Sequence, residues 1–345
     1  MKTASPIVRL SGTYGATTAS LSLGPRSRTG LRAREKKALP RLKTEYLTEA
    51  LGSFTGYLAA DELYDGPYCV LSIVDNHSFR RLAFQVLDHA PTQKDIQAFF
   101  MEFKGELDSR GLKVLGVTTD GSNLYPEPLS MVWPGVPHQV CVFHVLKELT
   151  KQVLRAVAKE RKALVSGLTK GAKDPESRKR RKAKADLFEH RTLFVKKELT
   201  EAERKLLAKL MRGSPRLRAM RQIMEEAYRL FDRRYRMETA LKKLAKLRTK
   251  VKGKGLRQTL GKLFSETLEK ALTFLDNKEL ESTSNAVERG NRRHRKMQKM
   301  VYRTRSLTRL KERMAMDLLR ESESIGRHHS GLALHQERAR ALNPL

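Results

Sequence analysis

Cysteine and tryptophan are scarce in this chain of 345 residues, which contains only Cys69, Cys141 and a single Trp. Two cysteines so far apart exclude a zinc finger built from cysteine pairs and a disulfide framework, and they favour a reducing compartment. Long hydrophobic runs are also missing, since no stretch approaches the roughly 20 apolar residues that cross a bilayer. We therefore expect a soluble, cytoplasmic protein.

Acidic residues are absent from the N-terminal segment, residues 1–33, which is rich in Ser, Thr, Gly and Arg. This composition also occurs in transit peptides, but a poorly ordered terminus is its commoner meaning. We expect residues 1–50 to be a polar, basic lead-in with a short basic helix around residues 31–51.

Positive charge, in contrast, is in large excess. The chain has 70 Lys and Arg against 38 Asp and Glu, a formal net charge of +32. Such a surplus repels itself unless a polyanion neutralises part of it, so the charge predicts a nucleic-acid partner, without distinguishing DNA from RNA. With 39% hydrophobic residues the chain is able to bury a core, and its length suits two domains or one domain with a large insertion.

Strand patterns dominate residues 51–150. Short runs of β-branched, aromatic and aliphatic residues occur at residues 55–60, 68–74, 82–87, 113–119 and 138–144. An amphipathic helix separates the third run from the fourth, with Thr92 and Asp95 as its capping pair and Gly111 after its end. A meander, a crossover helix and two further strands are the order of an α/β core with a mixed sheet.

Helical patterns replace strands from residue 145 to about residue 280, where apolar stripes lie on a Lys- and Arg-rich background. We predict that residues 151–278 form a basic, all-helical insertion, with one helix start fixed by Thr200 and Glu203. The run RKRRKAK at residues 178–184 is interpreted either as a solvated, mobile segment or as a contact to phosphates.

A second Arg-rich helix is predicted to begin near Ser284 and to carry Glu288 in its first turns. We expect residues 279–320 to complete the α/β core, and residues 321–345 to be weakly ordered. The order of the elements thus predicts an α/β core that a large helical insertion interrupts.

Acidic residues stand at the ends of two predicted strands. Asp61 follows the run that ends at residue 60, and Asp120 follows the run that ends at residue 119. An acid in such a place needs a partner, and the carboxyl ends of parallel strands meet at one edge of a sheet. Together with Glu288, these acids predict a site for two divalent cations roughly 3.5 to 4 Å apart, for which Mg²⁺ is suited because it prefers oxygen ligands.

Each of these acids also has a plainer explanation. Asp61 would begin a turn with Glu62, and Asp75, which also ends a predicted strand, is a rival first ligand. Asp120 fits an Asx turn, and Glu288 fits a helix-capping acid. The hypothesis of a metal site therefore depends on the three acids taken together.

Cys141 and His144 are separated by two residues, as in one half of a zinc site. No second close pair of Cys or His completes a set of four ligands. A packed cysteine and a polar histidine are therefore favoured over zinc.

Four segments together resemble the DDE transposases of bacterial insertion sequences, in the Mutator-like and ISL3-like group. The segments are GYLAADELY at residues 56–64, GVTTDGS at 116–122, QVCVFH at 139–144 and SNAVERGN at 284–291. The resemblance covers about residues 55–320. It implies a ribonuclease H-like fold with a helical insertion between the second Asp and the final Glu.

The resemblance also implies a site and a reaction. Asp61, Asp120 and Glu288 correspond to the catalytic acids and metal ligands of the family, and Cys141 with His144 corresponds to its Cys-x-x-His element. The family uses two Mg²⁺ ions, with Mn²⁺ as a substitute, to cleave DNA at transposon inverted repeats and to join the freed 3′-hydroxyl to target DNA. Two or more protomers would assemble on the paired ends.

Double-stranded DNA is the partner that the resemblance implies, which would associate the protein with the nucleoid. Basic side chains of the insertion and of the last core helix are expected to contact its backbone. These are Arg178, Lys179, Arg180, Arg181, Arg289, Arg292, Arg293 and Lys296. Trp133 either stacks on an unpaired base or, as we favour, packs in the core.

The chain departs from the family pattern at its front. About 50 residues without cysteine leave little room for the N-terminal helix-turn-helix or zinc-binding module that relatives use to read the inverted repeats. Either that module is truncated or the basic insertion recognises the ends. Two alternatives to an active transposase stay open: a remnant that only binds DNA, and a structural RNA-binding protein for which the basic composition suffices.

Overall fold

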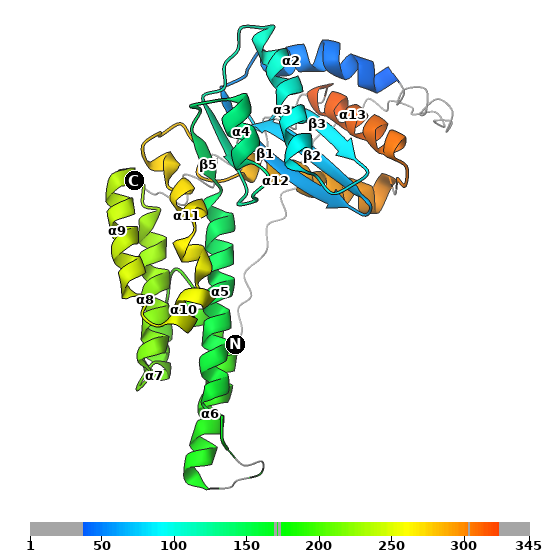
Figure 1. The fold of residues 1–345 in the computed structure, drawn as a ribbon. Helices are drawn as coiled ribbons and strands as arrows, with labels where there is room; N and C mark the ends of the chain where they lie inside the picture. The colour runs from blue at the N-terminus through cyan, green and yellow to red at the C-terminus, as the bar shows by residue number, and fades with distance from the viewer. Residues whose placement is uncertain (1–36, 169–170, 172–173, 303, 324–345) are drawn as a thin grey trace, which may run out of the picture.

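A computed structural model describes residues 37–302 and 304–323 of the protein, apart from residues 169–170 and 172–173. The expectations for residues 1–36 and for the tail from residue 324 lie outside the described residues. The described chain forms an α/β unit, which contains both of its ends, and a long helical arm that projects from this unit (Figure 1).

A five-stranded mixed sheet forms the centre of the α/β unit, with the strand order β3-β2-β1-β4-β5. The strands are β1 (Tyr57–Asp65), β2 (Tyr68–Asp75), β3 (Arg81–Leu87), β4 (Gly116–Thr119) and β5 (His138–Val140). The first three are antiparallel neighbours, and β4 is parallel to both β1 and β5. This is the mixed α/β sheet that the sequence predicts, with the arrangement of a ribonuclease H-like core.

Two predicted strand ends are wrong. Strand β1 does not stop at residue 60, because its antiparallel pairing with β2 continues to the pair Asp65↔Tyr68. The last strand ends at Val140 rather than at residue 144, since Cys141 caps the helix that follows. The apolar residues after Val140 form one face of that helix, where Val145 is buried. A short apolar run does not by itself distinguish a strand from a buried helix, which explains the wrong strand end.

Helices cover both faces of the sheet. The helices α3 (Gln93–Asp108) and α4 (Pro126–Val132) pack on one face, while α12 (Asn285–Met297) and α13 (Leu307–Glu323) contribute to the other. The predicted capping box of α3 is confirmed, and the buried side of this amphipathic helix carries Ile96, Phe99, Phe100, Phe103 and Leu107. Helix α4 lies in a Pro-rich stretch between β4 and β5, and its first residue is a proline, which suits a helix start.

The described chain begins with helical residues 37–41, followed by η1 (Leu42–Tyr46) and α2 (Leu47–Leu51). Tyr46 donates a hydrogen bond to the carbonyl oxygen of Arg81 at the start of β3, at 2.5 Å. The predicted basic helix near residue 50 is thus present over its described part and packs on the sheet.

The helical arm begins with α5 (Val142–Ala163), which runs from the end of β5 into the arm (Figure 1). Its other helices are α6 (Pro175–Glu189), η2 (Arg191–Phe194), α7 (Glu201–Leu210), α8 (Pro215–Leu230), α9 (Met237–Lys250), α10 (Lys254–Thr259), η3 (Gly261–Phe264), α11 (Glu266–Lys270) and η4 (Thr273–Leu275). The chain then returns to the sheet through α12, which continues as η5 (Gln298–Tyr302). The insertion is therefore helical throughout its described part, as predicted.

One hydrophobic core joins the arm to the sheet. It extends from Val140 at the sheet, through Leu149 and Val153 of α5, to Phe194 and Leu244 in the arm. The side chain of buried Gln139 reinforces this junction. Its amide donates to the carbonyl oxygen of Ala271 at 2.9 Å, and its oxygen accepts from the N–H of Phe274 at 2.8 Å.

The polybasic run at residues 178–184 lies within helix α6. Asp174 caps this helix by accepting a hydrogen bond from Ser177, Pro175 occupies its first position, and Leu187 is buried against the arm. The run is therefore helical, and the structure holds its basic side chains on a defined element. In the described residues, no helix combines the length and apolar character that a membrane span requires.

Candidate active site

Asp61 and Asp120 meet at the point where two parallel strands separate. The ladder between β1 and β4 ends with the pair Ala60↔Thr119, so Asp61 and Asp120 are the next residue on each strand. The prediction that Asp61 lies at the end of its own strand is wrong. Asp61 instead lies at the end of the parallel ladder between β1 and β4. The two acids therefore share one edge of the sheet, as the strand directions predict, because β1 and β4 are parallel up to this point.

Glu62 completes a group of three acids. Ligand oxygens of Asp61, Glu62 and Asp120 all lie within 4.8 Å of one another. Neighbouring residues of a strand point to opposite faces of the sheet. Because β4 ends at Thr119, Asp120 lies beyond its last paired residue and approaches both side chains at the sheet edge. Glu62 is therefore not part of a turn with Asp61, and the two adjacent acids in the sequence are the signal that could have identified it as a site residue.

Hydrogen bonds hold the side chains of this acidic group. Tyr125, which is fully buried, donates its hydroxyl hydrogen to Glu62. Asn291 of α12 donates its amide to Asp61 at 2.7 Å. The backbone N–H of Ser122 donates to Asp120 at 2.8 Å, so the Asx turn is present and one oxygen of Asp120 closes it.

Glu288 lies one helical turn before Asn291 on α12. Residues three apart on a helix are neighbours, so Glu288 faces the same edge of the sheet as the amide that binds Asp61. The alternative explanation of Glu288 as a helix-capping acid is wrong, because Ser284 is the N-cap residue and no side chain caps this helix. Instead, Glu288 lies 3.6 Å from Nδ1 of His144 and 3.4 Å from the hydroxyl of Ser284.

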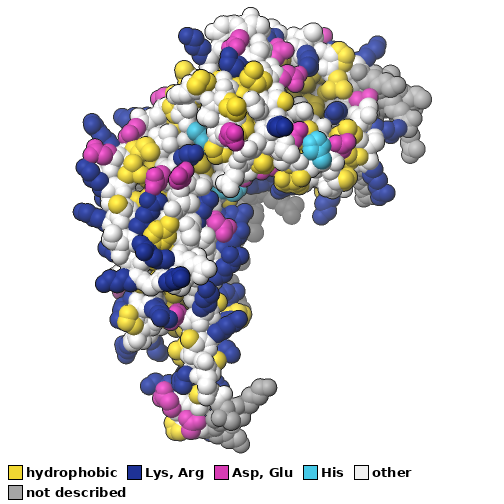
Figure 2. Space-filling view, in the orientation of Figure 1, with side chains coloured by type: hydrophobic (Ala, Val, Ile, Leu, Met, Phe, Trp, Pro, Cys, Tyr) yellow, Lys and Arg dark blue, Asp and Glu magenta, His cyan; other side chains and the backbone are white. Residues whose placement is uncertain are grey.

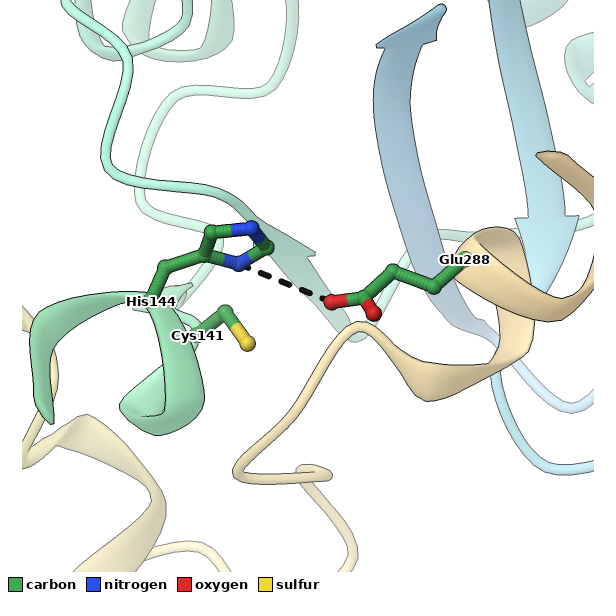
Figure 3. A group of neighbouring side chains, drawn as sticks. All are labelled: Cys141, His144 and Glu288. Atoms are coloured by element: carbon green, nitrogen blue, oxygen red, sulfur yellow. Dashed lines mark ion pairs between the residues drawn. The ribbon is translucent and has the colours of Figure 1, made fainter. Parts of the chain in front are cut away.

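Cys141 and His144 form a second group with Glu288. Their ligand atoms and those of Glu288 all lie within 4.8 Å of one another, and Figure 3 shows the three side chains pointing toward one another. Cys141 is fully buried at the start of α5, and His144 is partly buried. The sequence could not place Glu288 here, since it is brought to the pair only by the return of the chain from the arm.

Burial raises the free-energy cost of ionising the carboxyl groups of this acidic group. Desolvation, followed by the charges of Asp120 and Glu62, raises the pKa of Asp61 to about 7, although His144 and Asn291 oppose this shift. Desolvation and the charge of Asp120 also raise the pKa of Glu62, against the hydrogen bond from Tyr125. Adjacent carboxylates resist joint ionisation, and a divalent cation removes that conflict. The ligand atoms of the three acids are hard carboxylate oxygens that lie close together, so they fit Mg²⁺ or Mn²⁺.

A lysine of the arm lies next to the acids. A Cβ atom built on Gly121 would be 3.4 Å from Nζ of Lys262 in η3. Burial lowers the pKa of Lys262, while the charges of Glu148 and Asp120 oppose this effect. Lys262 could not be found from sequence, because nothing distinguishes one lysine among many until the fold brings it beside Asp120.

The rival ligand Asp75 has a different role. It is fully buried at the end of β2, and its two oxygens accept four hydrogen bonds. The donors are the N–H and hydroxyl of Thr55, at 2.7 and 2.9 Å, and the N–H groups of His77 and Ser78, at 3.0 and 2.8 Å. Asp75 therefore closes a turn and fixes the segment that enters β1.

Trp133 is buried, with 8% of its surface exposed, and its ring centroid lies 5.2 Å from that of Phe100. The favoured interpretation of this residue as part of the core is confirmed. Stacking on an unpaired base would require a surface that this side chain lacks.

The predicted DNA-contacting residues occupy two helices. On α6, Arg178 and Lys179 are exposed, whereas Arg180 donates to the carbonyl oxygens of Leu164 and Ser166 and thereby ties α6 to the end of α5. Arg181 is partly buried on the same helix. Lys and Arg side chains cover much of the visible face of the arm (Figure 2).

On α12, Arg292 and Lys296 are exposed and Arg293 is partly buried. The guanidinium of Arg289 lies over the ring of Phe79, 5.0 Å from its centroid. The basic side chains of α12 therefore lie on the same helix as Glu288, close to the acidic group.

Comparison with known proteins gives one finding on family. A sequence model of the ISL3 group of DDE transposases, described as transposase, matches residues 70–314. This range includes Asp120, Cys141, His144 and Glu288 but begins after Asp61, whose position follows from the register of β1 and β4. A search of curated proteins gave no match.

Proposed function

Because the chain belongs to the ISL3 family of DDE transposases, we propose that it cleaves and joins DNA strands at the inverted repeats of a transposon, with Asp61, Asp120 and Glu288 as catalytic acids. The observation that supports this most is the convergence of Asp61 and Asp120 at the end of a parallel strand pair, beside the helix that carries Glu288. Two or more copies of the chain would act on the paired ends.

The three acids, with Glu62 beside them, would hold two Mg²⁺ or Mn²⁺ ions. When bound, such ions activate the attacking hydroxyl and stabilise the leaving oxygen of the phosphodiester. The protein's own groups set up this site. Asn291 holds Asp61 in place, Tyr125 holds Glu62, and the turn at Ser122 holds Asp120.

Lys262 supplies positive charge next to the acids. A phosphodiester that approaches Asp120 brings negative charge to a carboxylate cluster, and a nearby ammonium group reduces that repulsion. Since Lys262 belongs to the arm, the arm contributes to the site as well as to the DNA-binding surface.

The proposal is tested with purified protein and duplex DNA that carries the ends of its own element. In the presence of Mg²⁺ or Mn²⁺ we expect nicks that leave a 3′-hydroxyl, detected by extension with a polymerase, and joining of that end to a second DNA. Tight binding of the ends without any cleavage in either metal would identify the protein as a remnant that only binds DNA.

Metal binding to these acids is expected to release protons near neutral pH. The pKa of Asp61 is raised to about 7, so below pH 7 a cation must displace a proton from this carboxyl group. The apparent affinity for Mn²⁺ should therefore fall by up to about tenfold per pH unit below pH 7 and level off above it. Calorimetric titrations in two buffers of different protonation enthalpy measure the released protons. Equal proton release from the wild type and from Asp61→Asn would contradict the assignment.

DNA binding is expected to depend steeply on salt, with α12 contributing. Changing the exposed Arg292 and Lys296 to Gln removes up to two phosphate contacts, so the slope of log K against log salt should become shallower by up to about 2. The control changes Lys94 and Lys113 to Gln, since both are exposed and lie outside α12 and α6. Fluorescence anisotropy at several salt concentrations gives both slopes, and equal slopes for the two double variants would exclude α12 from the interface.

A further inference from the structure

The cluster of Cys141, His144 and Glu288 differs in chemistry from the acidic group beside it. It offers one sulfur, one imidazole nitrogen and one carboxylate oxygen, all within 4.8 Å of one another. Mg²⁺ avoids sulfur ligands, whereas Zn²⁺ combines thiolate, imidazole and carboxylate ligands in tetrahedral sites. The two clusters are therefore suited to different ions. Glu288 belongs to the first cluster, and it lies one helical turn from Asn291, which binds Asp61 of the second.

The backbone fixes the positions of these ligands. Cys141 is the N-cap residue of α5 and His144 follows three positions later, so both face the same side of the first turn. The N–H of Val142 donates to the carbonyl oxygen of Ser282 at 2.9 Å. The N–H of Ser284 contacts the sulfur of Cys141 at 3.4 Å. These contacts join the start of α5 to the start of α12, so the third ligand is held opposite the first two (Figure 3).

The imidazole of His144 has a buried ring nitrogen that lacks a good hydrogen bond. This nitrogen, Nδ1, is shielded from solvent and makes no hydrogen bond of good geometry. Its neighbours are the carboxylate of Glu288, with which it forms an ion pair at 3.6 Å, and the thiol of Cys141. A buried polar atom without a partner costs free energy. A cation between this nitrogen, the carboxylate of Glu288 and the fully buried sulfur of Cys141 would satisfy all three.

We propose that Cys141, His144 and Glu288 form a binding site for Zn²⁺, and that this ion inhibits the enzyme. Three protein ligands leave a fourth position open, as in zinc sites that exchange a ligand. A bound Zn²⁺ holds Glu288 against α5 and withdraws it from the ions that Asp61 and Asp120 bind. The inhibitory part rests on the function proposed above, whereas zinc binding does not.

Cobalt tests the binding part, because Co²⁺ replaces Zn²⁺ in such sites and its thiolate complex absorbs in the near ultraviolet. Wild-type protein titrated with Co²⁺ should show this charge-transfer band, and Zn²⁺ added afterwards should remove it. Cys141→Ser should abolish the band, and His144→Gln should weaken Co²⁺ binding at least about 100-fold. The matched control is Cys69→Ser, which changes the other cysteine and should keep the band.

Two results would overturn zinc binding at this site: no band in the folded wild type, or a band that survives Cys141→Ser. Circular dichroism shows whether each variant is folded. Asp120→Asn separates the two metal sites, because it should keep the cobalt band while losing Mn²⁺ binding. Loss of the band in folded Asp120→Asn would mean that the ion binds elsewhere.

Inhibition is measured as DNA strand cleavage in Mg²⁺ with increasing Zn²⁺. Wild-type and Cys69→Ser proteins should lose activity at about one equivalent of Zn²⁺ and regain it with a chelator, while the Cys141→Ser protein should resist. A cobalt band without inhibition would refute the inhibitory role alone. An inactive wild type would refute the proposed function but would leave the cobalt result to decide on the site.

Discussion

Replacing Asp120 by Asn is expected to lower the rate of DNA strand cleavage about 1,000-fold or more, the scale of losing a principal electrostatic group of an active site. Ligand oxygens of Asp120 lie within 4.8 Å of those of Asp61 and Glu62, so the change removes one of the charges that would hold the proposed ions. An Asn side chain has the same shape and keeps an oxygen for the hydrogen bond from Ser122. The turn should therefore persist, and the loss should come from the charge alone.

DNA binding distinguishes this result from misfolding. The variant Asp120→Asn should bind DNA with the affinity of the wild type, because the basic helices that we propose to contact phosphates are unchanged. A matched control is Glu127→Gln on α4, an exposed acid that is not a member of the group, which should cleave at the wild-type rate. Strand cleavage is followed with end-labelled DNA in Mn²⁺. Cleavage by Asp120→Asn within tenfold of the wild type would remove Asp120 from the catalytic acids.

The sheet and the location of the site were largely predictable from sequence. Periodicity identified the elements of the α/β unit, and the rule that parallel strands share a carboxyl edge placed Asp61 near Asp120. Asp61 was expected at the end of its strand, whereas β1 continues beyond it to Asp65. The edge exists because β4 is only four residues long and leaves the upper half of β1 without a parallel partner.

Other parts of the site depend on contacts that no local pattern contains. The side chain of Glu62 starts on the face of the sheet opposite to that of Asp61, so strand alternation predicts that the two stay apart. They approach each other only because the sheet ends beside them. In the same way, Lys262 reaches the site from within the arm, and Glu288 does so after the chain has left the arm, so their partners could not be read from spacing.

Replacing Asp75 by Ala is expected to lower the free energy of unfolding by about 3 to 5 kcal/mol, because four hydrogen-bond donors lose a charged acceptor in a buried place. Two of these donors belong to Thr55, just before β1, and two belong to the turn after β2. Asp88, which directly follows β3, is the matched control. Its side chain is 68% exposed, so Asp88→Ala should change stability by less than about 0.5 kcal/mol.

The same variant decides between Asp75 and Asp61 as the first metal ligand. Asn76, next to Asp75, donates its N–H to the carbonyl oxygen of Tyr57 at 2.8 Å, so the turn that Asp75 closes also fixes the start of β1. We expect urea unfolding to show the loss of stability, while folded Asp75→Ala protein keeps its Mn²⁺ binding, because the ligands of the ion remain. The reverse outcome, unchanged stability with lost Mn²⁺ binding, would make Asp75 the ligand and would move the site away from the ladder between β1 and β4.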